Sequence, residues 1–220
     1  MIPVLSEIEA RVLGCLMEKE MSTPDYYPLT LNSLVLACNQ KSNRCPEMSL
    51  DEAAVREAVD TLRYRHHLVW EVSTAGSRVP KYKHDAEKSL GLTAQDKAVL
   101  CELLVRGPQT AGEVRSHAGR LCDFKDPDEA AAVLRALEQH AAGPYVVQLP
   151  REAGARERRY AHLLSGPPAP APAPAADRRP ADREPGLRER VAAIESDVAS
   201  MKSDIQALRD QVLLFMKKFE

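Results

Sequence analysis

The sequence predicts a mainly α-helical protein with small β-hairpins, built from tandem winged helix-turn-helix domains and a C-terminal coiled-coil helix. Three observations lead to this prediction: an internal repeat, the same series of helix and hairpin signals in both copies, and a heptad pattern near the C-terminus. We expect winged-helix domains at 1–88 and 89–165, a Pro/Ala-rich disordered linker at 166–186 and a coiled-coil helix at 187–220.

The internal repeat covers about 80 residues per copy. The segment LSEIEARVL at 5–13 recurs as LTAQDKAVL at 92–100, and KYKH at 81–84 is matched by RYAH at 159–162. Two copies are too few for a solenoid, so the pattern indicates a duplicated domain.

Helix start signals recur at equivalent places in the two copies. Ser6 and Thr93 each precede a helical apolar pattern and have an acid three residues later, Glu9 or Asp96. We expect the remaining helices to start in the same way, the second ones after Thr30 and Thr110 and the third ones at Ser49 and Asp126.

A β-hairpin is predicted to close each copy. In the first, strands over 68–72 and 78–84 flank a short loop, and in the second, strands over 145–149 and 158–164 flank a longer loop. Three helices followed by a two-stranded ribbon are typical of the winged helix-turn-helix.

The last segment has apolar residues spaced alternately four and three residues apart from 187 to 219. This is a heptad seam, and its β-branched first positions favour two parallel strands. We therefore expect a homodimer through 187–219, although a helix that folds back onto the globular part is the alternative. The predicted dimerisation residues are Val191, Ile194, Val198, Met201, Ile205, Leu208, Val212 and Phe215.

The composition argues against a wholly disordered chain and against a membrane-spanning protein. The 220 residues include 30 basic and 32 acidic side chains, for a net charge of -2, and 44% are hydrophobic, which is enough to build a core. The longest apolar runs fall well short of the roughly 20 residues that cross a bilayer. With five cysteines, an odd number, and no export signal, we expect a cytoplasmic protein with free thiols and no membrane contact.

Three segments within 3–166 closely resemble the YceH family of bacterial proteins, whose biochemical role is unassigned. They are LSEIEARVLGCLMEKEMSTPDYYPLTLNSLVLACNQKSNRCP, RGPQTAGEVRSHA and GPYVVQLPREAGARERRYAHLLSG. The resemblance implies a tandem winged-helix fold and supplies no catalytic residues. The linker and the heptad segment look like an addition to the family's pattern.

A nucleic-acid interface is one interpretation of the cations in the first copy. The candidate residues lie after the second helix, on the third helix and on the hairpin: Lys41, Asn43, Arg44, Arg56, Arg63, Arg78, Lys81 and Lys83. The third helix, however, begins with Asp51 and Glu52, which would repel phosphates, and acids lie one turn from its arginines.

Two functions follow from these features. The first is a dimeric DNA-binding or transcription-associated protein, and the alternative is a protein–protein interaction adaptor that uses winged helices as docking modules and binds no DNA. A continuous positive face would favour the first, and scattered charge would favour the second.

We do not expect an enzyme. The sequence has neither a Gly-rich phosphate loop nor a nucleophile elbow, so we predict no catalytic residues, no metal site and no cofactor. We expect His66 and His67 to have a structural role, and Cys15 and Cys101 to be small core residues. His117 and Cys122 could not hold a metal ion alone, because a third ligand is missing.

Overall fold

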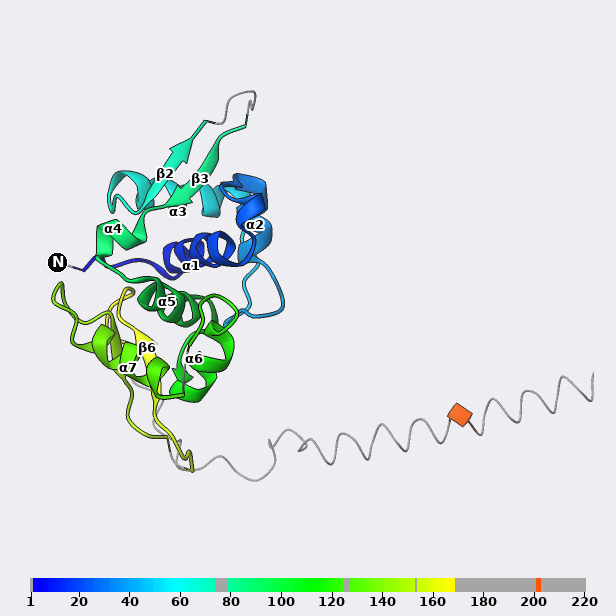
Figure 1. Ribbon diagram of the computed structural model, residues 1–220. Helices are drawn as coiled ribbons and strands as arrows, with labels where there is room; N and C mark the ends of the chain where they lie inside the picture. The colour runs from blue at the N-terminus through cyan, green and yellow to red at the C-terminus, as the bar shows by residue number, and fades with distance from the viewer. Residues whose placement is uncertain (1, 74–78, 125–126, 153, 169–200, 203–220) are drawn as a thin grey trace, which may run out of the picture. The chain divides into compact units, whose positions relative to one another are not determined.

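The computed structural model describes residues 2–73, 79–124, 127–152, 154–168 and 201–202 (Figure 1). It is mainly helical, with small antiparallel sheets. The chain divides into two compact units, Met1–Ala169 and Pro170–Glu220. Both copies of the sequence repeat lie in the first unit, and the fold of that unit is described below.

The two copies share one order of elements: helix, strand, helix, helix, strand, strand. The first copy consists of α1 (Glu7–Ser22), the short 3-10 helix η1 (Pro24–Tyr26), β1 (Leu29–Thr30), α2 (Leu31–Cys38), α3 (Glu52–Tyr64), β2 (Val69–Val72) and β3 (Lys81–His84). The second consists of α5 (Ala94–Arg106), β4 (Gln109–Thr110), α6 (Ala111–Ala118), α7 (Pro127–Glu138), β5 (Val146–Gln148) and β6 (Arg159–His162). Between them lies α4 (Ala86–Leu90).

Most of the predicted helix starts are confirmed. Complete capping boxes join Ser6 to Glu9 and Thr93 to Asp96, while the hydroxyls of Thr30 and Thr110 cap α2 and α6. Each cap satisfies backbone N–H groups that the first turn of a helix leaves without a partner.

The predicted start of the third helix at Ser49 is wrong by two residues. The cap is Asp51, whose Oδ1 accepts a hydrogen bond of 2.8 Å from the N–H of Ala54. Leu50 stays outside the helix because its backbone N–H and C=O are both bound by the side-chain amide of Asn39, at 2.8 Å each. The equivalent residue of the second copy, Asp126, lies outside the described residues.

Each sheet has three strands rather than the two that the hairpins predict, in the orders β1-β3-β2 and β4-β6-β5. The extra strands are β1 and β4, which pair antiparallel with β3 and β6: Leu29 faces Tyr82, and Gln109 faces Tyr160. A two-residue strand is too short to show any alternation of apolar and polar residues, so the sequence did not reveal it.

The helices α1 and α5 pack against each other at the centre of this unit, with α3 against α1 and α7 against α5 (Figure 1). One continuous apolar core includes Val12, Leu13 and Leu16 of α1 and residues of α5. Gly14 permits the close approach, because a Cβ placed there would lie 2.9 Å from Leu104 Cβ and 2.9 Å from Val105 Cγ1. The two copies therefore share their core.

The heptad segment falls almost entirely outside the described residues. Met201 is helical and 62% exposed, and the other seven predicted dimerisation residues are not described. In the described ranges, no helix combines the length and the apolar character needed to span a membrane.

Candidate functional site

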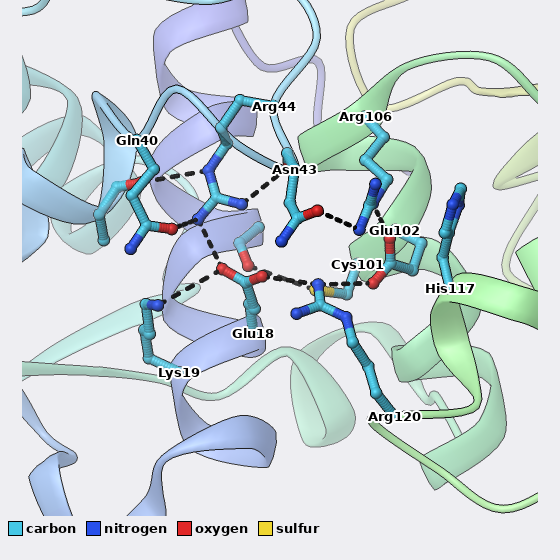
Figure 2. A network of polar contacts seen from close by, with 12 residues as sticks. Glu18, Lys19, Gln40, Asn43, Arg44, Cys101, Glu102, Arg106, His117 and Arg120 are labelled. Atoms are coloured by element: carbon cyan, nitrogen blue, oxygen red, sulfur yellow. Dashed lines mark hydrogen bonds and ion pairs between the residues drawn. The ribbon is translucent and has the colours of Figure 1, made fainter.

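Four charged side chains meet where the two copies join (Figure 2). Glu18 of α1 forms ion pairs with Arg44, from the loop after α2, and at 2.7 Å with Arg120, which follows α6. Arg120 also contacts Glu102 of α5 at 3.0 Å. The side chains of Glu18, Arg44 and Glu102 are almost completely buried. We call these four residues the junction network.

The junction network continues toward the surface through Arg106. Its Nε lies 2.7 Å from Glu102 Oε2, and its second guanidinium nitrogen donates a hydrogen bond of 2.7 Å to Asn43 Oδ1 (Figure 2). Asn43 has a backbone φ of 61°, a conformation that asparagine tolerates better than most residues. This loop of the first copy is thereby tied to α5 of the second.

Electrostatics keep Glu18 and Arg44 of the junction network ionised. Burial alone would raise the pKa of Glu18, but hydrogen bonds from Arg44 and Arg120 outweigh it and lower the pKa below its usual value. Burial tends to lower the pKa of Arg44, yet nearby negative charge, Glu18 included, raises it overall. Each charge thus depends on its neighbours, as expected for buried ion pairs.

A second polar cluster also joins the copies. Glu20 of α1 lies 2.6 Å from Lys97 Nζ of α5 and 2.9 Å from His84 Nε2 at the end of β3. Lys97 also contacts Glu87 of α4, at 2.9 Å. The contact with His84, aided by Lys97, lowers the pKa of Glu20 to about 2.

This shift predicts acid sensitivity. The carboxyl of Glu20 has a lower pKa in the folded chain than its usual value of about 4.3 in an unfolded chain. Its contribution to stability is therefore complete above about pH 4.5 and is lost as the pH falls toward 2. In urea unfolding, the stability difference between wild type and Glu20→Gln should shrink over this range. Glu47→Gln, at an exposed position, should show no such change.

The structure corrects the assignment of Arg44 as a nucleic-acid contact. Its side chain is buried, and besides Glu18 it donates hydrogen bonds to the carbonyl oxygens of Ala37 and Asn43 and to Gln40. The Arg44 guanidinium makes its hydrogen bonds inside the protein, so it cannot reach a phosphate. Asn43 is exposed, but its side-chain oxygen is occupied by Arg106.

The arginines of α3 are paired as well. Arg56 contacts Glu52 at 2.8 Å, and Arg63 contacts Glu71 of β2 at 2.8 Å and Asp60 at 3.5 Å. The guanidinium of Arg63 also lies 4.9 Å from the centre of the Tyr64 ring. These pairs neutralise most of the positive charge that the helix could offer to DNA.

The remaining candidate cations come from different elements of the first copy. Lys41 is exposed in the loop after α2, Lys83 is exposed on β3, and Lys81 is half-buried at the other end of β3. Arg78 lies outside the described residues. Of the eight candidates, the structure thus leaves three lysines, from the loop after α2 and from β3, that form no ion pair within the described residues.

Two large aromatic side chains are open to solvent near these pairs. Tyr64 at the end of α3 is 69% exposed and Trp70 of β2 is 51% exposed. The two elements pack together and are joined by the ion pair between Arg63 and Glu71. A shallow depression along α3 is lined by Ala53, Arg56, Tyr64 and their neighbours. We call this surface of α3 the α3 face. Trp70 lies on the other face of the ribbon, because successive side chains of a strand alternate and the neighbouring Glu71 is the one that contacts α3.

Sequence reasoning missed the junction network apart from Arg44. One signal was available: Glu102 interrupts the otherwise apolar run CELLV, where a charge must be paired if the helix is buried. The sequence could not show which cation would pair with it.

The two cysteines assigned to the core, Cys15 and Cys101, are indeed fully buried. Within the described ranges, no cluster of His, Cys, Asp or Glu could hold a metal ion.

Comparison with known proteins identifies the family. A family model described as "Protein of unknown function, DUF480" matches residues 5–155. The chain belongs to this family. A UPF0502 protein of Photobacterium profundum is 49% identical, with 93% of this chain and 95% of that one aligned. One from Aeromonas hydrophila is 47% identical over 95% of this chain and 96% of its own length.

A third relative bears on the C-terminal segment. A UPF0502 protein of Pelobacter propionicus is 46% identical, and the alignment includes 99% of each chain. It therefore runs through the linker and heptad segment, so the interpretation of these parts as an addition to the family is wrong for this relative.

Proposed function

We propose that both copies are winged helix-turn-helix domains and that the protein is a non-enzymatic interaction adaptor. The order helix, strand, helix, helix and hairpin, with a three-stranded sheet in each copy, supports the winged-helix assignment. We also propose that the YceH family, recognised from sequence motifs over 3–166, is the same family as DUF480, because the two cover nearly the same residues.

One observation carries the adaptor proposal. On the α3 face, Arg56 and Arg63 are ion-paired within the protein, whereas Tyr64 remains exposed. A DNA-reading helix needs free cations, while protein interfaces are enriched in exposed aromatic residues that become buried on binding. The ion pairing of Arg56 and Arg63 therefore favours the adaptor over the DNA-binding alternative.

The charges of the α3 face indicate the chemistry of the partner. Asp51, the cap of α3, and Glu57 within α3 are exposed acids, and neither forms an ion pair in the described part of the chain. A fitting partner is a protein segment that inserts an apolar group beside Tyr64 and places basic side chains near these acids.

The test is site-specific crosslinking in cells. A photoreactive phenylalanine analogue at position 64 should crosslink to one defined protein that survives nuclease treatment. Glu57→Lys should reduce the yield about tenfold or more, because it reverses the charge of an acid that lines the same depression as Tyr64. Tyr26 provides the matched control, because it is also an exposed tyrosine but lies on η1. Equal crosslinking from positions 26 and 64, or crosslinks only to nucleic acid, would overturn the adaptor proposal.

DNA binding is the second candidate function. Lys41 and Lys83 favour it, because both are exposed and neither has an ion pair in the described part of the chain. A mobility shift at low salt with genomic fragments, lost in the Lys41→Ala/Lys83→Ala variant, would support this function.

We also propose that the chain is a homodimer through residues 187–219. The unbroken heptad spacing supports this, since a helix packed back on a globular core usually has a wider apolar stripe. The mass of the intact chain in solution is the direct test.

A further inference from the structure

The three-stranded sheet of the first copy has two faces of different chemistry, because successive side chains of a strand point to opposite sides. The register places Trp70 of β2 opposite Lys83 of β3. In the next row on the same side, Lys81 of β3 lies between Val72 of β2 and Thr30 of β1. We call these five residues the outer face of the sheet.

The opposite face of the sheet packs on the helices. Tyr82 is buried there, and Glu71 contacts Arg63 of α3 at 2.8 Å. His84, at the end of β3, contacts Glu20 of α1. The outer face therefore points away from the core, which agrees with the exposure of its side chains.

The outer face combines an open aromatic ring with positive charge. Trp70 is 51% exposed, Lys83 is exposed and Lys81 is half-buried. Neither lysine forms an ion pair within the described residues, and none of the five residues is acidic. An aromatic ring with unpaired cations on the neighbouring strand can bind an anion that also has a flat apolar part.

Two acids lie at the margins of the outer face. Asp85 directly follows β3, and Asp25 lines a shallow depression together with Lys81 and Thr30. Their carboxylates would repel a phosphate at those margins. A polyanion would therefore lie over Trp70 and the two lysines, between these carboxylates.

This chemistry fits a nucleic acid better than a protein. Tryptophan is common in protein interfaces, but lysine is depleted there. Sites for single-stranded nucleic acid combine the two, because cations follow the phosphates and bases stack on aromatic rings. A duplex keeps its bases stacked on one another, so Trp70 can stack only on an unpaired base.

The polar groups of the outer face favour DNA over RNA. Thr30 has the only hydroxyl among its five residues, and that oxygen accepts a hydrogen bond of 3.2 Å from the Ser33 N–H and lies 2.9 Å from Ser33 Oγ. A protein distinguishes RNA by binding the ribose 2′-hydroxyl. Here the one hydroxyl suited to that contact already caps α2.

We propose that the outer face binds single-stranded DNA, with one base stacked on Trp70 and phosphates paired with Lys81 and Lys83. This site does not rest on the adaptor function, because the outer face and the α3 face are different surfaces. It also differs from the second candidate function, in which the protein binds duplex DNA.

The test uses the fluorescence of the full chain, since Trp70 is its only tryptophan. An oligothymidylate of about 12 nucleotides should quench this fluorescence at low salt. Three probes of the same length serve as comparisons: a duplex, an oligouridylate and a strand of abasic deoxyribose phosphates. The abasic strand should bind about tenfold more weakly, because it has the charge but no base to stack. The duplex should not quench, and the oligouridylate should bind no more tightly than the DNA strand.

The salt dependence of binding measures the phosphate contacts. Two lysines on a single strand predict a slope of about -1.4 for log K against log salt. The Lys81→Ala/Lys83→Ala variant should weaken binding and lose most of this slope. Lys41→Ala is the matched control, because it removes another exposed lysine, in the loop after α2, and should leave binding unchanged.

Substitutions of Trp70 test stacking, with binding followed by the anisotropy of labelled oligothymidylate. Trp70→Ala should weaken binding about tenfold, whereas Trp70→Phe should retain most of it because the aromatic ring remains. Circular dichroism of both variants checks that they fold. If Trp70→Ala does not fold, the comparison of Trp70→Phe and Lys83→Ala with wild type still decides the question.

Four results would overturn the proposal. These are unchanged tryptophan fluorescence at tens of micromolar oligothymidylate, equal binding of duplex and single strand, tighter binding of the oligouridylate than of the DNA strand, and wild-type binding by the Lys81→Ala/Lys83→Ala variant. Wild-type binding by a folded Trp70→Ala variant would reject base stacking and, with it, a single-strand site.

Discussion

Replacing Glu18 by alanine is expected to lower the free energy of unfolding by about 3–5 kcal/mol, the usual cost of removing one partner from a buried ion pair. The carboxylate of Glu18 contacts both Arg44 and Arg120, and the Arg44 side chain is completely buried. Alanine would leave that guanidinium inside the protein facing only neutral acceptors. The shift of the urea midpoint, with the slope of the transition unchanged, measures the loss.

The matched control is Glu52→Ala. Glu52 also pairs with an arginine, Arg56, at 2.8 Å, but the two side chains are 63% and 53% exposed. An exposed pair contributes at most about 1 kcal/mol, so this variant should unfold almost like wild type. Equal losses in the two variants would show that the junction network contributes no more than a surface contact.

Gly14→Ala is expected to destabilise the protein by about 2 kcal/mol through overpacking. The added methyl group would lie 2.9 Å from Leu104 Cβ and from Val105 Cγ1, so α1 and α5 would have to separate. Because Leu104 Cβ is attached directly to the backbone, a change of rotamer cannot relieve that contact. Thermal and urea unfolding of the full chain measure the effect.

Gly112→Ala is expected to change the stability of the protein in the opposite direction. Gly112 is also helical, in α6, but a Cβ there would meet nothing within 4 Å. Alanine at this position should stabilise the protein by up to about 1 kcal/mol, since it is the better helix former. If Gly14→Ala were as stable as Gly112→Ala, the close approach of the two central helices would not depend on glycine.

The order of the main helices and hairpins could be predicted from the sequence because their signals are local. A capping box such as Ser6 with Glu9 needs only four residues in a row, and the repeat transferred each assignment from one copy to the other. Ser49 failed as a cap because the decisive contact comes from Asn39, eleven residues before Leu50.

The candidate site was harder to predict, because it depends on contacts between distant parts of the chain. Arg44 resembles a surface cation in a polar loop, and only its pairing with Glu18, 26 residues away, shows that it is internal. Arg120 is a similar case, because its partners Glu18 and Glu102 lie 102 and 18 residues away. No local pattern encodes such contacts.

The packing of α1 against α5 has a consequence for how the protein can be recognised. Each copy contributes its equivalent helix to the contact, which is the pattern of an isologous interface between two identical subunits, here joined in a single chain. With this back-to-back arrangement, α3 and α7 lie on opposite sides of the central pair (Figure 1). A rigid partner of the kind proposed for the α3 face would therefore leave α7 uncovered.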